Sequence, residues 1–230
     1  MPVLRRLVRV SAVVLGAALV VTGCSPVKMG AAAIVGNQRI TIATLDTEVT
    51  NLSQNAKLYP GTVQLTPAQE TQETLTWLVR FQINEELARQ AGITVSTAQA
   101  EAALAQIYAA AKAQAQAQGL SNVTLNLILV ANGIPPDMAA ELGRYQAIQE
   151  QFILRANSGK IPTTTSAQSA TTAKLQRAQC LAAKTLQIQI NPQFGQLNYT
   201  QYQIVSAPNP VSGPPGPAKP TSQSGLMPAC

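Results

Sequence analysis

Histidine is missing from all 230 residues of the chain. Its absence excludes an imidazole general base, the histidine-containing catalytic triads and histidine metal ligation. Three cysteines without a histidine do not supply the ligands of a zinc site. Neighbouring carboxylates do not compensate, because Glu85 and Glu86 lie on one predicted helix and point about 100° apart. The sequence therefore predicts a non-enzymatic protein with no catalytic residue, no metal ligand and no bound cofactor.

Acidic residues are missing from the last third of the chain, residues 151–230, and all 10 acids precede it. A segment with this charge suits an anionic membrane surface or a cell-wall polymer. A solvated segment without such a partner is the simpler interpretation. Aromatic residues make up only 4% of the chain and its cations are thinly spread, so nucleic acid is not an expected partner. The cations of the segment are Arg155, Lys160, Lys174, Arg177, Lys184 and Lys219.

The apolar run near the N-terminus is too short for a permanent transmembrane helix. As a helix, Val10–Val21 would rise about 18 Å, whereas the hydrocarbon core of a bilayer is about 30 Å thick. A basic start with arginines at positions 5, 6 and 9 precedes the run, and small residues follow it. A basic start, a short apolar stretch and a small-residue cleavage site are typical of a secretory signal peptide.

The residues at the end of this segment indicate which kind of signal it is. Val21-Thr22-Gly23-Cys24 resembles the lipobox of bacterial lipoproteins, in which the cysteine thiol receives a diacylglyceryl group. Two acyl chains anchor a protein stably, whereas one chain binds a membrane only marginally. We expect residues 1–23 to be removed and Cys24 to hold the protein on the extracytoplasmic face of the cell membrane. An ordinary signal peptide followed by a chance cysteine is the alternative.

Two cysteines remain when Cys24 carries a lipid. Export implies a compartment in which disulfide bonds form. An even number of remaining cysteines favours one bridge between Cys180 and Cys230, and two free thiols are the alternative. The bridge would tie the end of the chain back to the domain and would stabilise it by about 2–4 kcal/mol.

The periodicity of the chain predicts a mainly α domain over residues 33–205. It follows a short tether, residues 24–32, and precedes a Pro-rich flexible tail, residues 206–230. Short strands are predicted at each end of the domain, with a turn at 36–38 between the first two and an alternating strand at 186–190. Residues 163–172, rich in Thr and Ser, are predicted as a linker or loop. The predicted helices cover about 41–55, 66–92, 96–119, 125–132, 135–159 and 173–185.

Local start and stop signals support two of these helices strongly. Thr66 followed by Pro67 and Gln69 forms a capping-box pattern, and Ser96 with Gln99 forms a second one. Gly92 ends the first of the two helices. Its apolar stripe is Leu75, Leu78, Val79, Ile83 and Leu87.

The few aromatic residues on the helices are the candidate binding residues. Such side chains line a peptide-binding groove in some proteins, and more often they are simply core. The candidates for contact with a client polypeptide are Trp77, Phe81, Tyr145 and Phe152.

Three stretches resemble the N-terminal domain of SurA-type extracytoplasmic chaperones. Ala33–Thr41 (AIVGNQRIT) is similar to the opening strand and turn of that family, although the turn here reads Gly-Asn rather than Asn-Gly. Leu87–Ser96 (LARQAGITVS) is similar to a helix end followed by the entry to the next helix. Ile188–Gly195 (IQINPQFG) resembles the closing strand, with Gln and Phe where the family has Arg and Tyr. The likeness spans about residues 33–205.

The resemblance implies that the closing strand pairs with the opening strand and that the helices between them form a cradle for unfolded polypeptide. It implies a chaperone or holdase that binds unfolded or newly exported chains. No parvulin prolyl-isomerase domain is covered by the resemblance, so isomerase activity is not expected. Two alternatives remain open: a non-catalytic adaptor or scaffold lipoprotein of the cell envelope, and a lipoprotein that binds an apolar ligand between its helices.

Overall fold

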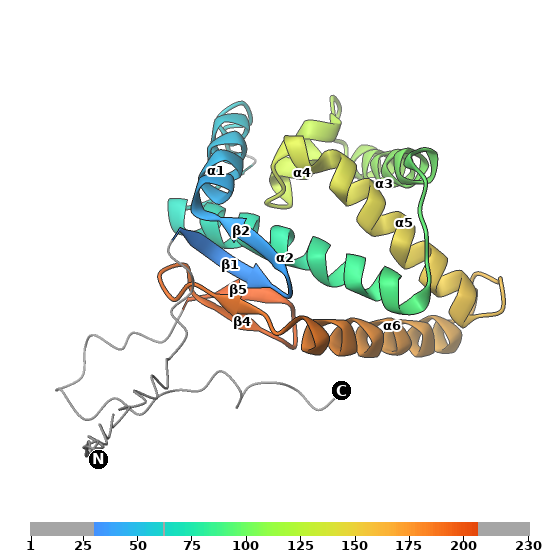
Figure 1. Cartoon of the computed structure of the whole chain (residues 1–230). Helices are drawn as coiled ribbons and strands as arrows, with labels where there is room; N and C mark the ends of the chain where they lie inside the picture. The colour runs from blue at the N-terminus through green and yellow to red at the C-terminus, as the bar shows by residue number, and fades with distance from the viewer. Residues whose placement is uncertain (1–29, 62, 207–230) are drawn as a thin grey trace, which may run out of the picture.

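The computed structural model describes residues 30–61 and 63–206, and in these ranges the chain is mainly helical with a small antiparallel sheet (Figure 1). The predicted fold class is therefore confirmed. The predicted signal peptide, Cys24, nearly all of the tether and the Pro-rich tail lie outside the described residues. No helix in the described ranges is long and apolar enough to cross a membrane.

The main sheet joins the two ends of the domain. Strand β1 (Ala31–Val35) lies between β2 (Gln38–Thr41) and β3 (Gln189–Ile190), antiparallel to both. Ala33 pairs with Ile190, which confirms the predicted pairing of the opening and closing strands. Strand β1 begins two residues earlier than expected. Ala31 and Ala32 are fully buried, so the end of the expected tether belongs to the core.

The first three helices begin within one residue of their predicted starts, and the second ends at the predicted Gly92. The N–H of Thr44 binds the Thr41 hydroxyl at the start of α1 (Ile42–Ala56). Capping boxes at Thr66 and Ser96 begin α2 (Pro67–Ala91) and α3 (Thr97–Ala117). Gly92 ends α2 in the left-handed conformation, at φ 62°. Because glycine adopts this conformation without steric cost, the helix stops there.

Helix α2 lies in the middle of the fold, with α6 running along it below (Figure 1). One side of α2 buries Leu75, Val79, Ile83 and Leu87 in the main core, with the sheet and α6. Its other side packs Phe81 in a second apolar cluster formed with α4 (Leu125–Ala131) and α5 (Ala139–Ala156). A short 3₁₀ turn, Pro136–Met138, precedes α5. Helix α2 thereby packs against α1, α5, α6 and both sheets.

Helices α3 and α5 approach each other closely at Gly143. A β-carbon at this position would lie 2.5 Å from the carbonyl oxygen of Ala100 and 3.1 Å from the Leu104 Cβ. Only a residue without a side chain allows this backbone contact.

Helix α6 (Thr165–Leu186) is longer than predicted, and the linker expected at residues 163–172 is wrong. The hydroxyl of Thr164 accepts the N–H of Ala167 and caps the helix. Thr171 is buried, and its hydroxyl lies 2.8 Å from the Ala167 carbonyl and 3.1 Å from Asn157 Oδ1. The hydrogen bonds of Thr164 and Thr171, to the helix itself and to Asn157, offset the low helix propensity of this Thr-rich stretch. Because α6 continues to Leu186, only Gln189 and Ile190 of the strand expected at 186–190 form a strand, β3.

A second sheet, not predicted from the sequence, consists of the hairpin β4 (Gln196–Asn198) and β5 (Gln203–Val205). The hairpin buries Leu197 and Ile204 in the main core. The backbone N–H of Ile204 donates to the Thr76 hydroxyl at 2.8 Å, so β5 is fastened to α2. The hairpin thereby forms one wall of a cavity beside α2.

Candidate functional site

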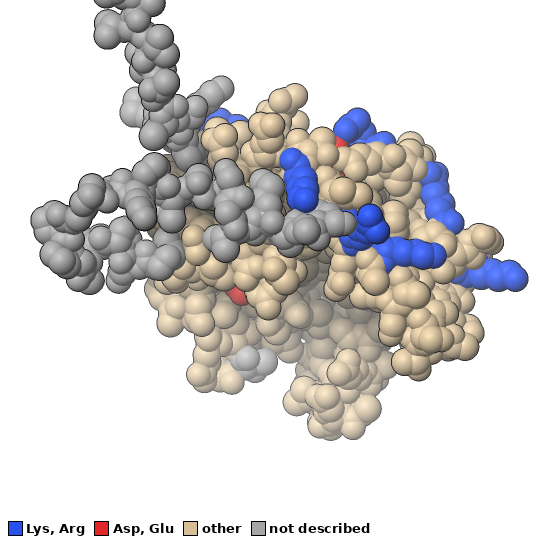
Figure 2. All heavy atoms as spheres, turned by 90° about the horizontal axis from the view of Figure 1, so that it is seen from below, with Lys and Arg blue, Asp and Glu red and all other residues tan. Residues whose placement is uncertain are grey.

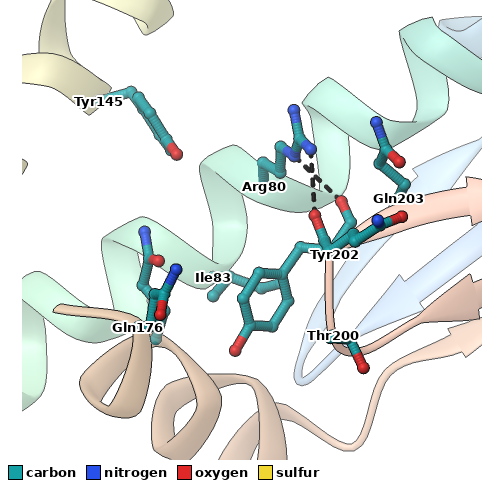
Figure 3. A pocket seen from close by; sticks show the side chains of 9 residues that line it. Arg80, Ile83, Tyr145, Gln176, Thr200, Tyr202 and Gln203 are labelled. Carbon is teal, nitrogen blue, oxygen red and sulfur yellow. Dashed lines mark hydrogen bonds between the residues drawn. The ribbon is translucent and has the colours of Figure 1, made fainter. Parts of the chain in front are cut away.

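A cavity of about 520 Å³ lies between α2, α5, α6 and the β4–β5 hairpin (Figure 3). Its volume falls in the range of about 300–1,000 Å³ that is usual for ligand sites. The lining contains one cation, four glutamines and no acid. It consists of Arg80, Ile83, Tyr145, Gln176, Gln179, Thr200, Gln201, Tyr202 and Gln203.

Arg80, on α2, holds the hairpin against the helix. Its Nε donates to the Tyr202 carbonyl at 3.0 Å and its Nη2 donates to the Gln201 carbonyl at 3.1 Å, as Figure 3 shows. The guanidinium carbon also lies 5.1 Å from the centre of the Trp77 ring, a cation–π distance. These three contacts fix the orientation of a half-buried guanidinium group at the edge of the cavity.

The turn of the hairpin is held in an unusual conformation at Tyr202. Its φ of 50° lies in the left-handed region, which costs a residue with a side chain about 1–3 kcal/mol. An Asx turn precedes it, in which the N–H of Thr200 donates to Asn198 Oδ1 at 2.9 Å. Burial raises the pKa of the Tyr202 phenol to about 12. The phenol therefore stays neutral at physiological pH.

Tyr145, on α5, directs its hydroxyl into the cavity from the opposite side (Figure 3). Burial raises the pKa of this phenol, and the positive charge of Arg80 opposes the rise. Buried Asn84 donates from its amide to the Tyr145 backbone carbonyl at 3.0 Å and so fixes α5 on α2. The cavity thus offers a neutral hydroxyl close to a permanent cation.

Three of the four predicted aromatic candidates meet in one cluster. The ring centres of Trp77, Phe81 and Tyr145 lie 5.7–5.9 Å apart in tilted and edge-to-face arrangements. Of these only Tyr145 lines the cavity, while Phe81 is buried and Trp77 donates its indole N–H to the Asn132 carbonyl. Phe152 packs elsewhere, against the core clusters that contain Leu87 and Ile148.

Sequence reasoning missed Arg80 and the glutamines of the cavity. They come from α2, α6 and the hairpin, and about a hundred residues of sequence separate Arg80 from the nearest of the glutamines. No motif of fixed spacing connects them. One signal was present: Gln176 and Gln179 are three residues apart, so they share a face of any helix that contains them.

Large apolar side chains are rarely exposed on the described part of the chain. Those that are exposed lie on four different segments of the sequence. They are Leu58, Leu120, Ile161 and Leu181.

The face seen from below in Figure 2 is rich in lysine and arginine. Helix α6 lies on this side in Figure 1 and carries the exposed Lys174 and Arg177 and the half-buried Lys184. Both interpretations of the basic segment, a solvated surface and contact with an anionic membrane or polymer, stay open.

An acidic cluster lies apart from the cavity, where α1 meets the start of α5. Burial raises the pKa of Glu48, and the carboxylates of Asp137 and Glu141 raise it further. Asn51 donates to Asp137 at 2.8 Å. Within the described ranges, no group of three or more acids and cysteines is arranged to hold a metal ion.

Replacing Glu48 with glutamine should stabilise the protein at neutral pH. Because the pKa of Glu48 is raised in the folded state, its ionisation weakens the fold as pH rises from about 4.5 through that raised value. We expect Glu48→Gln to raise the Tm by a few degrees at pH 7 and by less at pH 4. Asp46→Asn, which removes an exposed charge from the same helix, is the control. Equal effects of both substitutions at both pH values would contradict the assignment.

Cys180 takes part in a disulfide bond, and its partner lies outside the described residues. The pairing with Cys230 therefore stays a prediction. Cys24, the expected site of lipidation, also lies outside the described residues, so its lipidation stays a prediction.

Comparisons with protein families, curated proteins and solved structures give no match to this chain.

Proposed function

We propose that this chain is a non-enzymatic lipoprotein, anchored through Cys24 to the extracytoplasmic face of the membrane, whose helical domain binds polypeptide segments. The observation that carries the proposal is the cavity beside α2, lined by four glutamines and two tyrosines. An amide side chain both donates and accepts hydrogen bonds, so it can pair with the backbone of an extended peptide of any sequence. The cavity suits a bound peptide segment because backbone groups that leave water need such partners.

The expected anchor supports the same function. Only a few residues separate Cys24 from the start of β1 at Ala31. An extended chain spans at most about 3.6 Å per residue, so a lipid on Cys24 would keep the domain within about 25 Å of the membrane surface. A holdase for newly exported polypeptides acts at this location. The resemblance to the SurA N-terminal domain points to the same client class.

A single-partner adaptor is the second candidate function, and one observation favours it. A general holdase offers continuous apolar surface to many clients, whereas the exposed large apolar residues here lie on separate segments. A polar cavity of limited size is closer to the binding site of an adaptor than to the continuous apolar surface of a general holdase. The same polarity disfavours an apolar ligand.

Suppression of aggregation by the purified protein distinguishes the candidates. We expect an equimolar amount to slow the aggregation of two unrelated unfolded proteins, reduced α-lactalbumin and heat-denatured citrate synthase. A variant with Gln176→Ala and Gln179→Ala should protect less. Substitution of Gln168 and Ser169, exposed on the same helix but outside the cavity, is the control. Absence of protection for both clients would refute the holdase, and crosslinking that captures one protein would then support the adaptor.

A further inference from the structure

We propose that the cavity beside α2 recognises a carboxylate on the bound polypeptide and that Arg80 is the residue that binds it. This inference rests on the proposed polypeptide binding and names the ligand chemistry of the same site. A carboxylate has two sources in a polypeptide, the free C-terminus and the side chains of Asp and Glu.

The charge of Arg80 has no carboxylate partner among the described residues. Arg89 pairs with Glu86 and Arg144 pairs with Glu85, whereas the hydrogen bonds of Arg80 go to the two backbone carbonyls of the hairpin. The lining contributes no acid either. A half-buried cation without a counter-charge is costly, and a bound carboxylate would remove that cost.

The contacts of Arg80 leave hydrogen-bonding capacity for a ligand. A guanidinium group has five N–H donors. The two donors in use lie on Nε and Nη2, so both N–H groups of Nη1 remain for a carboxylate. Carboxylates accept such charge-assisted hydrogen bonds more strongly than neutral groups do.

The surroundings of Arg80 hold it ready for this role. The Trp77 ring and the two hairpin carbonyls fix the guanidinium before any ligand arrives. A pre-organised side chain loses less conformational entropy when it binds. The cavity also places Tyr145 and Gln179 beside the cation as neutral groups for the rest of the peptide. Arg80 would bind the carboxylate, and the uncharged Tyr145 and Gln179 side chains would form hydrogen bonds with the rest of the peptide.

Four fluorescent ten-residue peptides of Ala, Ser and Gly test the proposal with the purified protein. One is neutral with an amidated C-terminus, and one has a free C-terminal carboxylate. One is amidated with a central Asp, and the last carries both carboxylates. We expect the carboxylate peptides to bind at least about tenfold more tightly than the neutral peptide. Tighter binding of the peptide with the free C-terminus would identify the C-terminal carboxylate as the ligand. Tighter binding of the amidated peptide with the central Asp would identify a side-chain carboxylate.

Arg80→Gln should abolish this preference, so that the carboxylate peptides bind this variant no more tightly than the neutral peptide does. Arg177→Gln removes the same charge from the exposed side of α6 and should keep the preference. Since Arg80 also holds the hairpin, Gln179→Glu provides a second variant that keeps those bonds and places a carboxylate in the cavity. Gln179→Glu should also abolish the preference for carboxylate peptides. Ala173 is exposed on the same helix, and Ala173→Glu should keep the preference.

The outcomes separate this inference from the function on which it rests. Equal binding of all four peptides, or a preference that survives both Arg80→Gln and Gln179→Glu, would overturn the carboxylate site and leave polypeptide binding intact. Failure of every peptide to bind would refute the proposed function itself.

Discussion

Replacing Ile190 with alanine is expected to lower the free energy of unfolding by about 2–5 kcal/mol. Ile190 is 2% exposed and packs in the main core, on the strand that pairs with Ala33 of β1. Loss of its side chain removes apolar burial and leaves a cavity in the main core. The sheet is where the two ends of the domain meet, so the whole domain should be affected. Urea denaturation should show a lower midpoint with an unchanged slope.

Gln189→Ala is the matched control for this prediction. Gln189 is the other residue of β3 and pairs with Ile34, but its side chain is exposed. A surface substitution of this kind usually changes stability by less than about 0.5 kcal/mol. If both substitutions cost the same, then β3 does not close the core in the way the structure shows.

Gly195→Ala is expected to cost on the order of 3 kcal/mol and to weaken peptide binding. Gly195 has a φ of 124°, and a β-carbon there would lie 2.3 Å from the carbonyl oxygen of Val205. The added methyl group would push β5 away from its position. The hydrogen bond between the Ile204 N–H and the Thr76 hydroxyl would then be lost, and with it the hairpin wall of the cavity.

The control separates backbone strain from the clash. Gly159 has a φ of 81°, but a β-carbon there would meet no atom within 4 Å. Gly159→Ala should therefore cost about 1–2 kcal/mol and leave peptide binding unchanged. Denaturation curves and peptide titrations of both variants test the prediction. A Gly195→Ala variant that binds peptide normally would show that the hairpin is not part of the site.

The local signals of this sequence predicted the helix ends well. Each of these helix ends depends on contacts between residues only a few positions apart, so it can be predicted from the local sequence. The examples are the capping boxes at Thr66 and Ser96 and the helix end at Gly92. The start of α6 depends on a distant contact instead. Thr171 is buried beside Asn157, and that packing stabilises a Thr-rich stretch that is a weak helix former by itself.

The hairpin and the cavity depend on tertiary structure still more. Strands β4 and β5 each have three residues, too few for their alternation to stand out from loops. Tyr145 was identified as a binding candidate because it is aromatic, and it does line the cavity. Arg80 gave no signal, since one arginine on a helix is usually a solvated side chain. Its role becomes visible only when the hairpin carbonyls and the absence of a lining acid are known.

Site-specific photocrosslinking tests the central claim, that the cavity is where polypeptide binds. Both Gln176 and Ser169 are exposed on α6, but only Gln176 lines the cavity, so a photoreactive p-benzoylphenylalanine is placed at each position in turn. With reduced α-lactalbumin as the client, we predict a crosslinked product at position 176 and at least about fivefold less at position 169. Excess unlabelled peptide should compete with the product at 176. Equal yields at the two positions, or a product at 169 alone, would contradict the account.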